Sequence, residues 1–308
     1  MAGPASLPAE RGIVPARPAA ENSQVRLRPL LLVLLLAAVC AASSAAAVLP
    51  LGDGHVGTGP AAGSVDACTL PALPGGPGGA AASVPWIVGT SWDSAAKPAV
   101  QGAVRWSAAS YSVTIGGSSR VIHTNDLPVG APTGTFPIAP TDPAYRYDRN
   151  PNAIRSVPTT FTLPVDPRVS ARPSCLPYGP IGVTTNGVYL FDALDGLRRD
   201  AVAHEVQDAC GGHPGPSGAY HYHEISPCLL AQAHGSATLV GYALDGFGIY
   251  VERDAHGNLL TDAALDACHG RTSTVPWNGR PTRIYHYDAT AEYPYTLGCL
   301  RGRLGTIG

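Results

Sequence analysis

Short runs of alternating apolar and polar residues recur through the first half of the chain and predict β-strands. These runs cover residues 86–88, 104–106, 111–115 and 121–123. Gly116-Gly117 separates the last two runs and predicts a turn. Residues 124–180 are dense in proline and predict long loops with short extended pieces. A helical period is clear only at residues 198–208. The pattern therefore predicts a mainly β protein (β-rich α+β) with one conspicuous helix.

An internal repeat organises the second half of the chain. Residues 181–191 (IGVTTNGVYLF) recur as residues 240–250 (VGYALDGFGIY) without a shift of spacing inside the segment. The motifs Asp-Ala-Cys, Tyr-His-Tyr and Cys-Leu then follow in the same order in both copies. Landmarks repeated in one order indicate a duplicated structural unit. We interpret them as two similar β units, about 181–229 and 240–300, packed around a pseudo-twofold axis.

The cysteines predict a disulfide framework. The chain has seven cysteines, one of which, Cys40, lies in the N-terminal segment, and the remaining six allow 15 pairings by sequence alone. An even number in an exported chain favours disulfides over metal ligation. Because each repeated unit has one cysteine pair, the repeat predicts one staple per unit and leaves a third pair. The predicted pairs are Cys210–Cys228, Cys268–Cys299 and Cys68–Cys175.

The N-terminal 47 residues have the order of features of an export signal. Two arginines precede an apolar run at residues 30–39, and the small residues Ala45-Ala46-Ala47 offer a cleavage site. The alternative is an uncleaved membrane anchor, since residues 30–49 are just long enough to span a bilayer. We expect an extracellular or cell-envelope protein, either secreted or membrane-anchored. The predicted divisions are a signal peptide or anchor at 1–47, a Gly/Ala/Pro-rich linker at 48–83 and a folded domain at 84–308.

Composition and charge narrow the classes of function. The chain has 308 residues, of which 14% are charged, with 36 Gly and 30 Pro, which suits a turn-rich β protein better than a helical one. A net charge of −2 argues against nucleic acid or anionic membrane as a partner. The sequence contains no nucleophile elbow, Walker loop or dinucleotide fingerprint. We expect contact with a membrane only through the N-terminal segment, if that segment is not cleaved.

Histidines concentrate around the stretch Tyr220-His221-Tyr222-His223. In an extended chain His221 and His223 share one face, and the two tyrosines pack on the other with their hydroxyls hydrogen-bonded. Imidazole is a ligand for divalent transition metals, so the cluster predicts a metal site, with zinc or copper as the ion. We expect His221 and His223 as the core ligands. The further candidate ligands are His213, His204 and His286.

The segment His204-Glu205-Val206-Gln207-Asp208 offers a second arrangement. On a helix, His204 and Asp208 would share a face, with Glu205 beside them, as in zinc proteases with Asp in place of the second His. The repeat argues against this, because Asp208 recurs as Asp266, whereas the histidine does not recur. We therefore expect Asp208 to cap or brace structure. Three further carboxylates are expected to be solvated surface groups: Asp192, Asp195 and Glu224.

The two units differ at two of the three positions that hold His213, His221 and His223 in the first. In the second unit these positions hold Arg271, His286 and Asp288. A site would therefore belong mainly to the first unit. We expect His286 and Asp288 to be able to complete that site across the axis.

These motifs resemble the YHYH-domain family, over about residues 100–303. The resemblance rests on the tetrapeptide at 220–223 and on five further stretches. They are Asn186-Gly187-Val188, residues 201–205 (AVAHE), residues 208–214 (DACGGHP), residues 241–246 (GYALDG) and residues 293–299 (YPYTLGC). Gly248 departs from the family pattern, which usually has proline there. The resemblance implies a mostly exported, bacterial-type protein and no particular activity.

Two functions from different classes follow. The first is an exported protein that binds a divalent metal through the histidine cluster, extending to a metal-dependent hydrolase or oxidoreductase. The alternative is a non-catalytic cell-envelope binding or structural module in which the Tyr/His strands are core. Its partner would be a small molecule or an envelope ligand of unspecified kind. Imidazoles that converge in a cleft would favour the metal-binding protein. Imidazoles that are each hydrogen-bonded to backbone in a dry core would favour the non-catalytic module.

Overall fold

The computed structural model describes residues 48–69, 81 and 83–308. The predicted signal peptide or anchor at 1–47 lies outside the described residues, as does part of the predicted linker. Within the described residues, no helix is long and apolar enough to cross a membrane. The described part of the chain is mainly β, as the sequence predicts.

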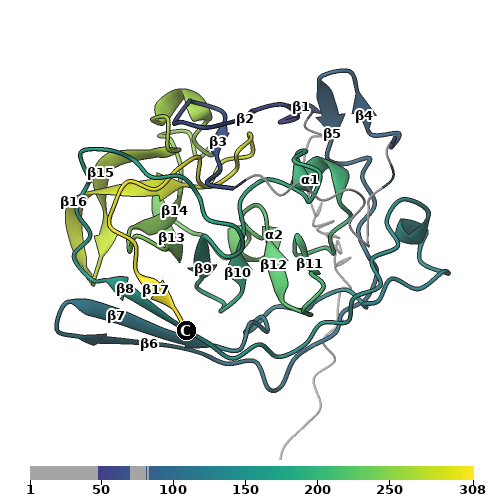
Figure 1. The fold of residues 1–308 in the computed structure, drawn as a ribbon, viewed down its shortest axis with the longest axis horizontal. Helices are drawn as coiled ribbons and strands as arrows, with labels where there is room; N and C mark the ends of the chain where they lie inside the picture. The colour runs from purple at the N-terminus through teal and green to yellow at the C-terminus, as the bar shows by residue number, and fades with distance from the viewer. Residues whose placement is uncertain (1–47, 70–80, 82) are drawn as a thin grey trace, which may run out of the picture. The chain divides into compact units, whose positions relative to one another are not determined.

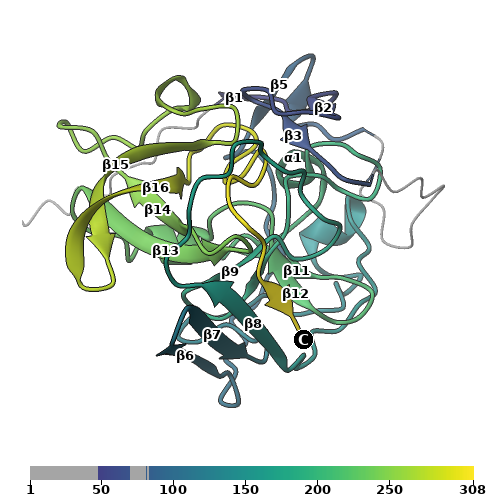
Figure 2. The same cartoon turned by 60° about the vertical axis from the view of Figure 1, so that its left-hand side comes forward.

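An eight-stranded sheet carries the histidine-rich segment. Its order is β11-β12-β10-β9-β13-β14-β16-β15. β12 pairs with β10, and β16 with β14, in parallel, and all other pairs are antiparallel. The two ends of this sheet lie on opposite sides in both ribbon views (Figures 1 and 2). The strands are β9 Gly182–Thr184, β10 Tyr189–Leu190, β11 Gly212–Pro214, β12 Tyr220–Tyr222, β13 Ala237–Ala243, β14 Gly248–Glu252, β15 Gly270–Trp277 and β16 Arg280–Asp288.

The eight-stranded sheet is arranged symmetrically about its central β9–β13 pair. Outward from β9 follow β10, β12 and β11, and outward from β13 follow β14, β16 and β15, so corresponding strands lie at equal distances from the centre. Asn186-Gly187 and Asp245-Gly246 form the turns after β9 and β13, with φ of 88° at Gly187 and 86° at Gly246. Glycine suits these turns because it adopts positive φ at little cost. Two repeated units would give this arrangement, and the repeat itself remains an interpretation.

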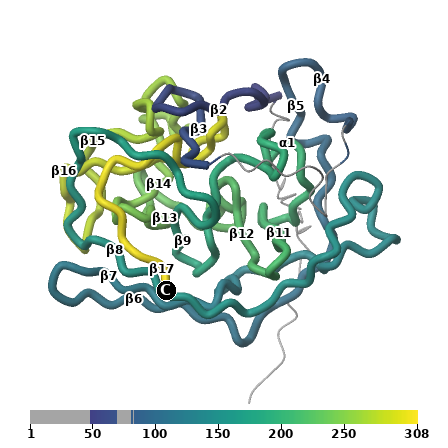
Figure 3. Tube along the Cα trace, viewed as in Figure 1, coloured from purple at the N-terminus to yellow at the C-terminus, as the bar shows by residue number. Residues whose placement is uncertain are grey.

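The remaining strands form three small sheets. One has the order β17-β8-β7-β6, and its β6–β7 hairpin turns at Gly116-Gly117 as predicted. The others are β1-β5-β4 and the parallel pair β2-β3. The bounds are β1 Val48–Pro50, β2 Val56–Gly57, β3 Val65–Asp66, β4 Ile87–Val88, β5 Ser91–Asp93, β6 Tyr111–Gly116, β7 Ser119–Thr124, β8 Thr159–Pro164 and β17 Thr306–Ile307. Figure 3 shows the long connections between β7 and β9.

Two predictions for these regions need correction. The expected strand at 104–106 is reduced to a single bridge between Val104 and Thr133. Residues 48–69 differ from the predicted linker, because they hold β1 to β3 and pack on the folded domain. Val65 is fully buried there, and the backbone N–H of Asp66 donates to Gly298 O at 2.8 Å. Buried backbone pairing of this kind overrides a linker-like composition.

The predicted helix at 198–208 is wrong in extent. Only α1 Ala201–His204 forms, a single turn capped by the Asp200 carboxylate, which accepts the N–H of Ala203. Arg198 has a φ of 66°, and Glu205 is extended with ψ of 153°, so neither can continue the helix. His204 and Asp208 therefore do not share a helix face. The other helical segments are α2 Pro227–Leu230 and the 3-10 turns η1 Pro143–Arg146 and η2 Asp262–Ala264.

Three disulfides and buried tyrosines hold the domain. The disulfides are Cys68–Cys175, Cys210–Cys228 and Cys268–Cys299, the pairs that the repeat predicts. Tyr220 and Tyr222 are fully buried. The Tyr220 hydroxyl donates to Asp208 Oδ2 at 2.8 Å, and the same carboxylate accepts the N–H groups of Gly134, Cys210 and Gly212. Asp208 thus braces structure, as its recurrence in the repeat predicts.

We predict that Tyr220→Phe lowers the free energy of unfolding by about 1–3 kcal/mol, because a buried hydrogen bond to a carboxylate is lost. Urea unfolding with the disulfides intact measures the change. The matched control is Tyr178→Phe, since Tyr178 is 71% exposed, and this variant should stay within about 0.5 kcal/mol of wild type. Equal midpoints for both variants would contradict the bracing role of Tyr220.

Candidate metal centre

Three histidines on or beside two neighbouring strands, β11 and β12, meet. His213 on β11 pairs directly with His221 on β12, and His223 follows the end of β12. The ring centroids are 4.5 Å apart for His213–His221, 4.9 Å for His221–His223 and 5.4 Å for His213–His223. Potential ligand atoms of all three lie within 4.8 Å of one another, and the residues are only 3–5% exposed. The predicted shared face of His221 and His223 is confirmed.

The other face of β12 fixes the direction of these rings. Tyr220 is bonded to Asp208, and the Tyr222 hydroxyl accepts a hydrogen bond from Asn186 Nδ2 at 3.1 Å. Phe191 stacks on His221 with a centroid distance of 4.1 Å. Because successive strand residues point to opposite faces, anchoring the tyrosines also orients the histidines.

Backbone carbonyls set the tautomers of two of the rings. His221 Nδ1 lies 3.2 Å from Ala219 O, and His223 Nδ1 contacts Asp192 O. A carbonyl only accepts hydrogen bonds, so each Nδ1 carries the proton and each Nε2 keeps a lone pair for another ligand. This is the usual outer support of a metal-binding histidine. Within the described part of the chain, neither ring nitrogen of His213 has a hydrogen-bond partner.

Glu205 adds a carboxylate to the three histidines. Its Oε2 lies 3.3 Å from His213 Nε2 and 3.4 Å from His223 Nε2, and it has no hydrogen-bond partner among the described residues. Two ligands of a tetrahedral zinc ion, each about 2.0–2.1 Å from the metal, are about 3.3–3.4 Å apart. The spacing therefore matches two edges of such a tetrahedron. We call His213, His221, His223 and Glu205 the first cluster.

Burial controls the protonation of the first cluster. Burial, with the neighbouring imidazoles adding to it, lowers the pKa of His221 to about 3 and that of His213 well below its usual value. It also lowers the pKa of His223 to about 4. Burial raises the pKa of Glu205 well above its usual value, and the nearby carboxylates Asp195 and Asp148 raise it further. The metal-free cluster is thus a set of neutral groups, of which the imidazoles can bind a cation at once and the carboxyl after losing its proton.

A buried ammonium group lies close to Glu205. Lys97 Nζ donates to Val202 O and Gln207 Oε1, and burial lowers the pKa of Lys97 to about 8. The carboxylates of Glu224 and Glu205 are among the groups that oppose this shift. Lys97 thus contributes positive charge beside the cluster without being a candidate ligand, because its donors are directed at neutral oxygens.

Of the three carboxylates expected on the solvated surface, Asp195 is buried, and Asp192 and Glu224 are half-buried. Asp195 is buried and accepts from Arg199 Nε at 2.7 Å. Burial raises the pKa of Asp192 to about 6 and that of Glu224 to about 7. Their sequence neighbours gave no sign of this, because tertiary contacts cover them.

Two predicted ligands lie outside the first cluster. His204 Nε2 pairs with Asp53 Oδ2 at 2.8 Å. His286 and Asp288 lie on β16 and group with Glu252 at the end of β14; we call these three residues the second cluster. Four strands separate β12 from β16 in the sheet. The prediction that His286 and Asp288 complete the first site is therefore wrong. Burial raises the pKa of Asp288 to about 8, with the nearby Glu252 adding to the shift.

Sequence reasoning missed Glu205 as a partner of the cluster histidines, because it treated this residue as part of a longer helix. The helix ends at His204, and the extended backbone at Glu205 lets its side chain reach His213 and His223. The available signal was the spacing of His213 and Glu205 in one short segment. That spacing alone does not define which side chains meet.

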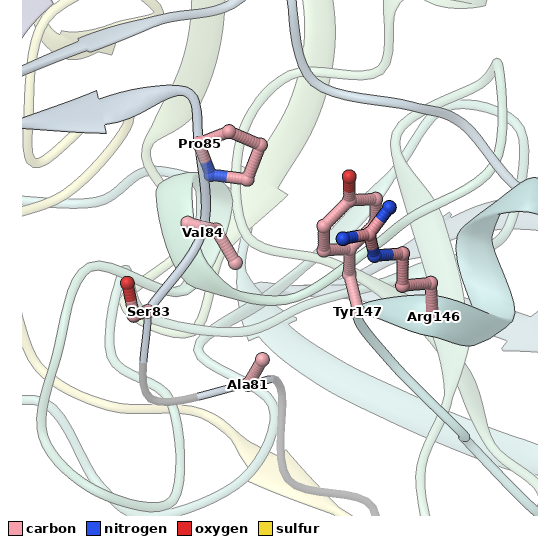
Figure 4. A pocket seen from close by; sticks show the side chains of 6 residues that line it. All are labelled: Ala81, Ser83, Val84, Pro85, Arg146 and Tyr147. Carbon is pink, nitrogen blue, oxygen red and sulfur yellow. The ribbon is translucent and has the colours of Figure 1, made fainter.

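No residue of the first cluster lines either of the two best-defined cavities among the described residues. One cavity, of about 550 Å³, lies between the segment before β4 and the turn η1 (Figure 4). Its lining residues are Ala81, Ser83, Val84, Pro85, Arg146 and Tyr147. The other is lined mainly by residues of β7, β8 and the segments beside them.

Comparison with known proteins gives one match. The model of the family described as "YHYH protein" matches residues 160–260. This range includes all of the first cluster and the Glu252 end of β14. No curated protein and no solved structure shows significant similarity to the chain.

We predict that His221 and His223 stay neutral in the metal-free folded protein until the pH falls to about 4 and below. Their folded pKa values of about 3 and 4 lie below the value of about 6.5 expected in the unfolded chain. The unfolded chain therefore binds more protons than the folded protein below pH 6.5. As the pH falls from 6.5 toward 4, these two histidines lower the free energy of unfolding. Glu205 acts in the opposite direction, because its folded pKa is raised.

An NMR titration of the ring signals, after metal removal, measures the two histidine pKa values directly. The same titration in urea supplies the unfolded reference. Ring protonation of both residues between pH 6 and 7 in the folded state would contradict the buried, neutral cluster.

Proposed function

We propose that this domain, whose residues 160–260 belong to the YHYH-domain family, holds one divalent metal ion in the first cluster as a structural site. His213, His221 and His223 supply imidazole nitrogens and Glu205 supplies a carboxylate oxygen. The ion that fits best is zinc. The protein is an exported one, in which the metal and the disulfides together hold a fold of short strands and long loops.

The observation that carries this proposal is the burial of three imidazoles against the carboxyl group of Glu205. Both ring nitrogens of His213 and the Oε2 atom of Glu205 have no hydrogen-bond partner among the described residues. Leaving such polar groups unpaired costs about 1–3 kcal/mol each. A metal ion at the centre would satisfy His213 and Glu205 together, which otherwise have orphaned atoms. The carbonyl contacts at His221 and His223 Nδ1 support the same assignment, because they present Nε2 to an ion.

The ligand set favours zinc over copper. Three nitrogens and one oxygen, with Glu205 at tetrahedral spacing from His213 and His223, suit zinc, which has no geometric preference of its own. Copper(II) prefers tetragonal arrangements, so the short contacts of Glu205 with two histidines suit it less.

A structural site fits better than a hydrolase or an oxidoreductase. Catalytic zinc usually keeps one position open for water or substrate, whereas four protein ligands close the site. The histidines are buried, and neither cavity reaches them. If Glu205 were a general base beside the metal rather than a ligand, the fourth position would be open, so Glu205 decides between the two roles.

The second candidate function is a cell-envelope binding module in which the Tyr/His strands are core without a metal. The backbone contacts of His221 and His223 favour it, because they satisfy one nitrogen of each ring. A metal-free core does not explain why His213 and Glu205 Oε2 are buried without hydrogen-bond partners among the described residues. Export is supported by the three disulfides, which persist in oxidising compartments.

We predict that the chain from Val48 onward, purified without chelators from an oxidising compartment, contains about one equivalent of zinc in the first cluster. His221→Ala combined with His223→Ala should remove it, because half of the ligands are lost. Elemental analysis with zinc titration measures both. The control is His234→Ala with His256→Ala, two exposed histidines, which should leave the zinc content unchanged. A wild-type protein that takes up no zinc or copper even after reconstitution would favour the core-only module.

Glu205→Gln separates a ligand from a base. A ligand role predicts a loss of zinc affinity of about 100-fold or more, since removing even an outer partner costs about 10–100-fold. Unchanged affinity would show that Glu205 is outside the coordination sphere and would reopen the catalytic assignment. The metal content and the near-UV circular dichroism spectrum are measured on the same sample, so that unfolding is recognised.

A further inference from the structure

The second cluster places an imidazole between two buried carboxylates. Glu252 ends β14, and His286 and Asp288 lie on one face of β16. Glu252 is buried, and the other two residues are fully buried. One potential ligand atom of each lies within 4.8 Å of those of the others. Buried carboxylates are rare unless paired or bound to a metal.

The tautomer of His286 leaves a lone pair directed at negative charge. His286 Nδ1 lies 3.0 Å from Ile284 O, so this nitrogen carries a proton. His286 Nε2 lies 3.1 Å from Glu252 Oε2 and 3.6 Å from Asp288 Oδ2. A lone pair facing two carboxylates is repulsive unless a proton or a cation lies between them.

Asp288 supplies an independent indication of a missing partner. Both of its carboxyl oxygens are buried and have no hydrogen-bond partner in the described part of the chain. Its Oδ2 is nevertheless directed toward the ring of His286. A proton on His286 would satisfy Glu252, which is already bonded to that nitrogen, and would leave Asp288 unpaired.

Arg271 does not replace such a partner. Its Nε lies 3.5 Å from Glu252 Oε2, outside good hydrogen-bond distance, and its side chain is 36% exposed. Glu252 also accepts from Ser273 Oγ at 3.1 Å. The guanidinium therefore acts on Glu252 from the rim and makes no ion pair with Asp288 within 4.0 Å. Ion pairs of this exposure contribute about 0–1 kcal/mol.

We propose that Glu252, His286 and Asp288 form a second divalent-cation site, separate from the first cluster and with a donor set suited to a harder ion such as Mn²⁺. Two carboxylates with one imidazole suit manganese, whereas three imidazoles with one carboxylate suit zinc. The 3.1 and 3.6 Å ligand spacings lie between those of octahedral Mg²⁺, about 2.9 Å, and Ca²⁺, up to about 3.7 Å.

Arg271 sets the strength of this site. It pairs with His286 across β15 and β16, as His213 pairs with His221 across β11 and β12. A positive charge thus occupies the place where the first cluster has a third imidazole. It repels an incoming cation and competes for Glu252, so the second site binds its ion more weakly than the first and exchanges it more readily.

The test uses the whole chain from Val48 onward, loaded with one equivalent of zinc to fill the first cluster and then titrated with Mn²⁺ while the free-ion signal is followed by electron paramagnetic resonance. We expect one equivalent of Mn²⁺ to bind. Asp288→Asn should weaken the binding at least 10-fold without changing the zinc content, and Arg271→Gln should strengthen it. The matched control is Asp254→Asn, an exposed carboxylate in the turn after β14, which should bind as wild type does.

The outcomes separate this site from the first cluster. Glu205→Gln should lose zinc and keep Mn²⁺, so failure of one site does not imply failure of the other. Wild-type protein that binds no Mn²⁺, or an affinity that neither Asp288→Asn nor Glu252→Gln changes, would overturn the proposal. A second zinc equivalent that Asp288→Asn removes would overturn manganese as the ion. Glu252→Gln serves if Asp288→Asn does not fold.

Discussion

The hydrogen bond between Tyr220 and the buried Asp208 carboxylate is the contact on which the candidate metal centre depends. It anchors one face of β12, and the opposite face then presents His221 to His213. The same carboxylate accepts three backbone N–H groups, which offset the cost that burial imposes on a charged group. The domain uses this device again. Three other aspartate–tyrosine pairs are Asp200–Tyr295, Asp245–Tyr287 and Asp266–Tyr285.

Much of the fold could be predicted from the sequence because its signals are local. The hairpin turns and the disulfide pairs follow from glycine-containing dipeptides and from the order of repeated landmarks. The failed predictions concern segments where a distant contact decides. Positive φ at Arg198 and the cap at Asp200 shorten α1, although the apolar spacing there favours a longer helix. The pairing of β1 to β3 likewise gives structure to a segment whose composition predicts a linker.

In the candidate site, too, features that depend on local sequence could be predicted, and features that depend on distant contacts could not. Strand periodicity was sufficient to place His221 and His223 together, because successive residues alternate between faces. The identity of the fourth group was not predictable, since Glu205 reaches the cluster only because α1 ends one residue earlier. His204 and His286 are chemically suited to bind a metal, yet both lie outside the first cluster, where they contact Asp53 and Glu252. The clustering of histidines in the sequence was enough to predict which types of ligand the site would have. Which of these residues lie close together depends on the path of the backbone, which the sequence pattern does not define.

The two proposed metal sites share one pairing geometry. In both, a histidine on the inner strand lies opposite a residue on the edge strand, and its Nδ1 is directed at the backbone carbonyl two residues earlier. The inner ring is therefore held alike, and only the surrounding side chains differ. Imidazoles at the neighbouring positions make the first cluster nitrogen-rich, whereas Asp288 and Arg271 make the second oxygen-rich and more positively charged at its rim. The ion preferences that we propose thus follow from the residues beside a shared ring orientation rather than from a change in the sheet.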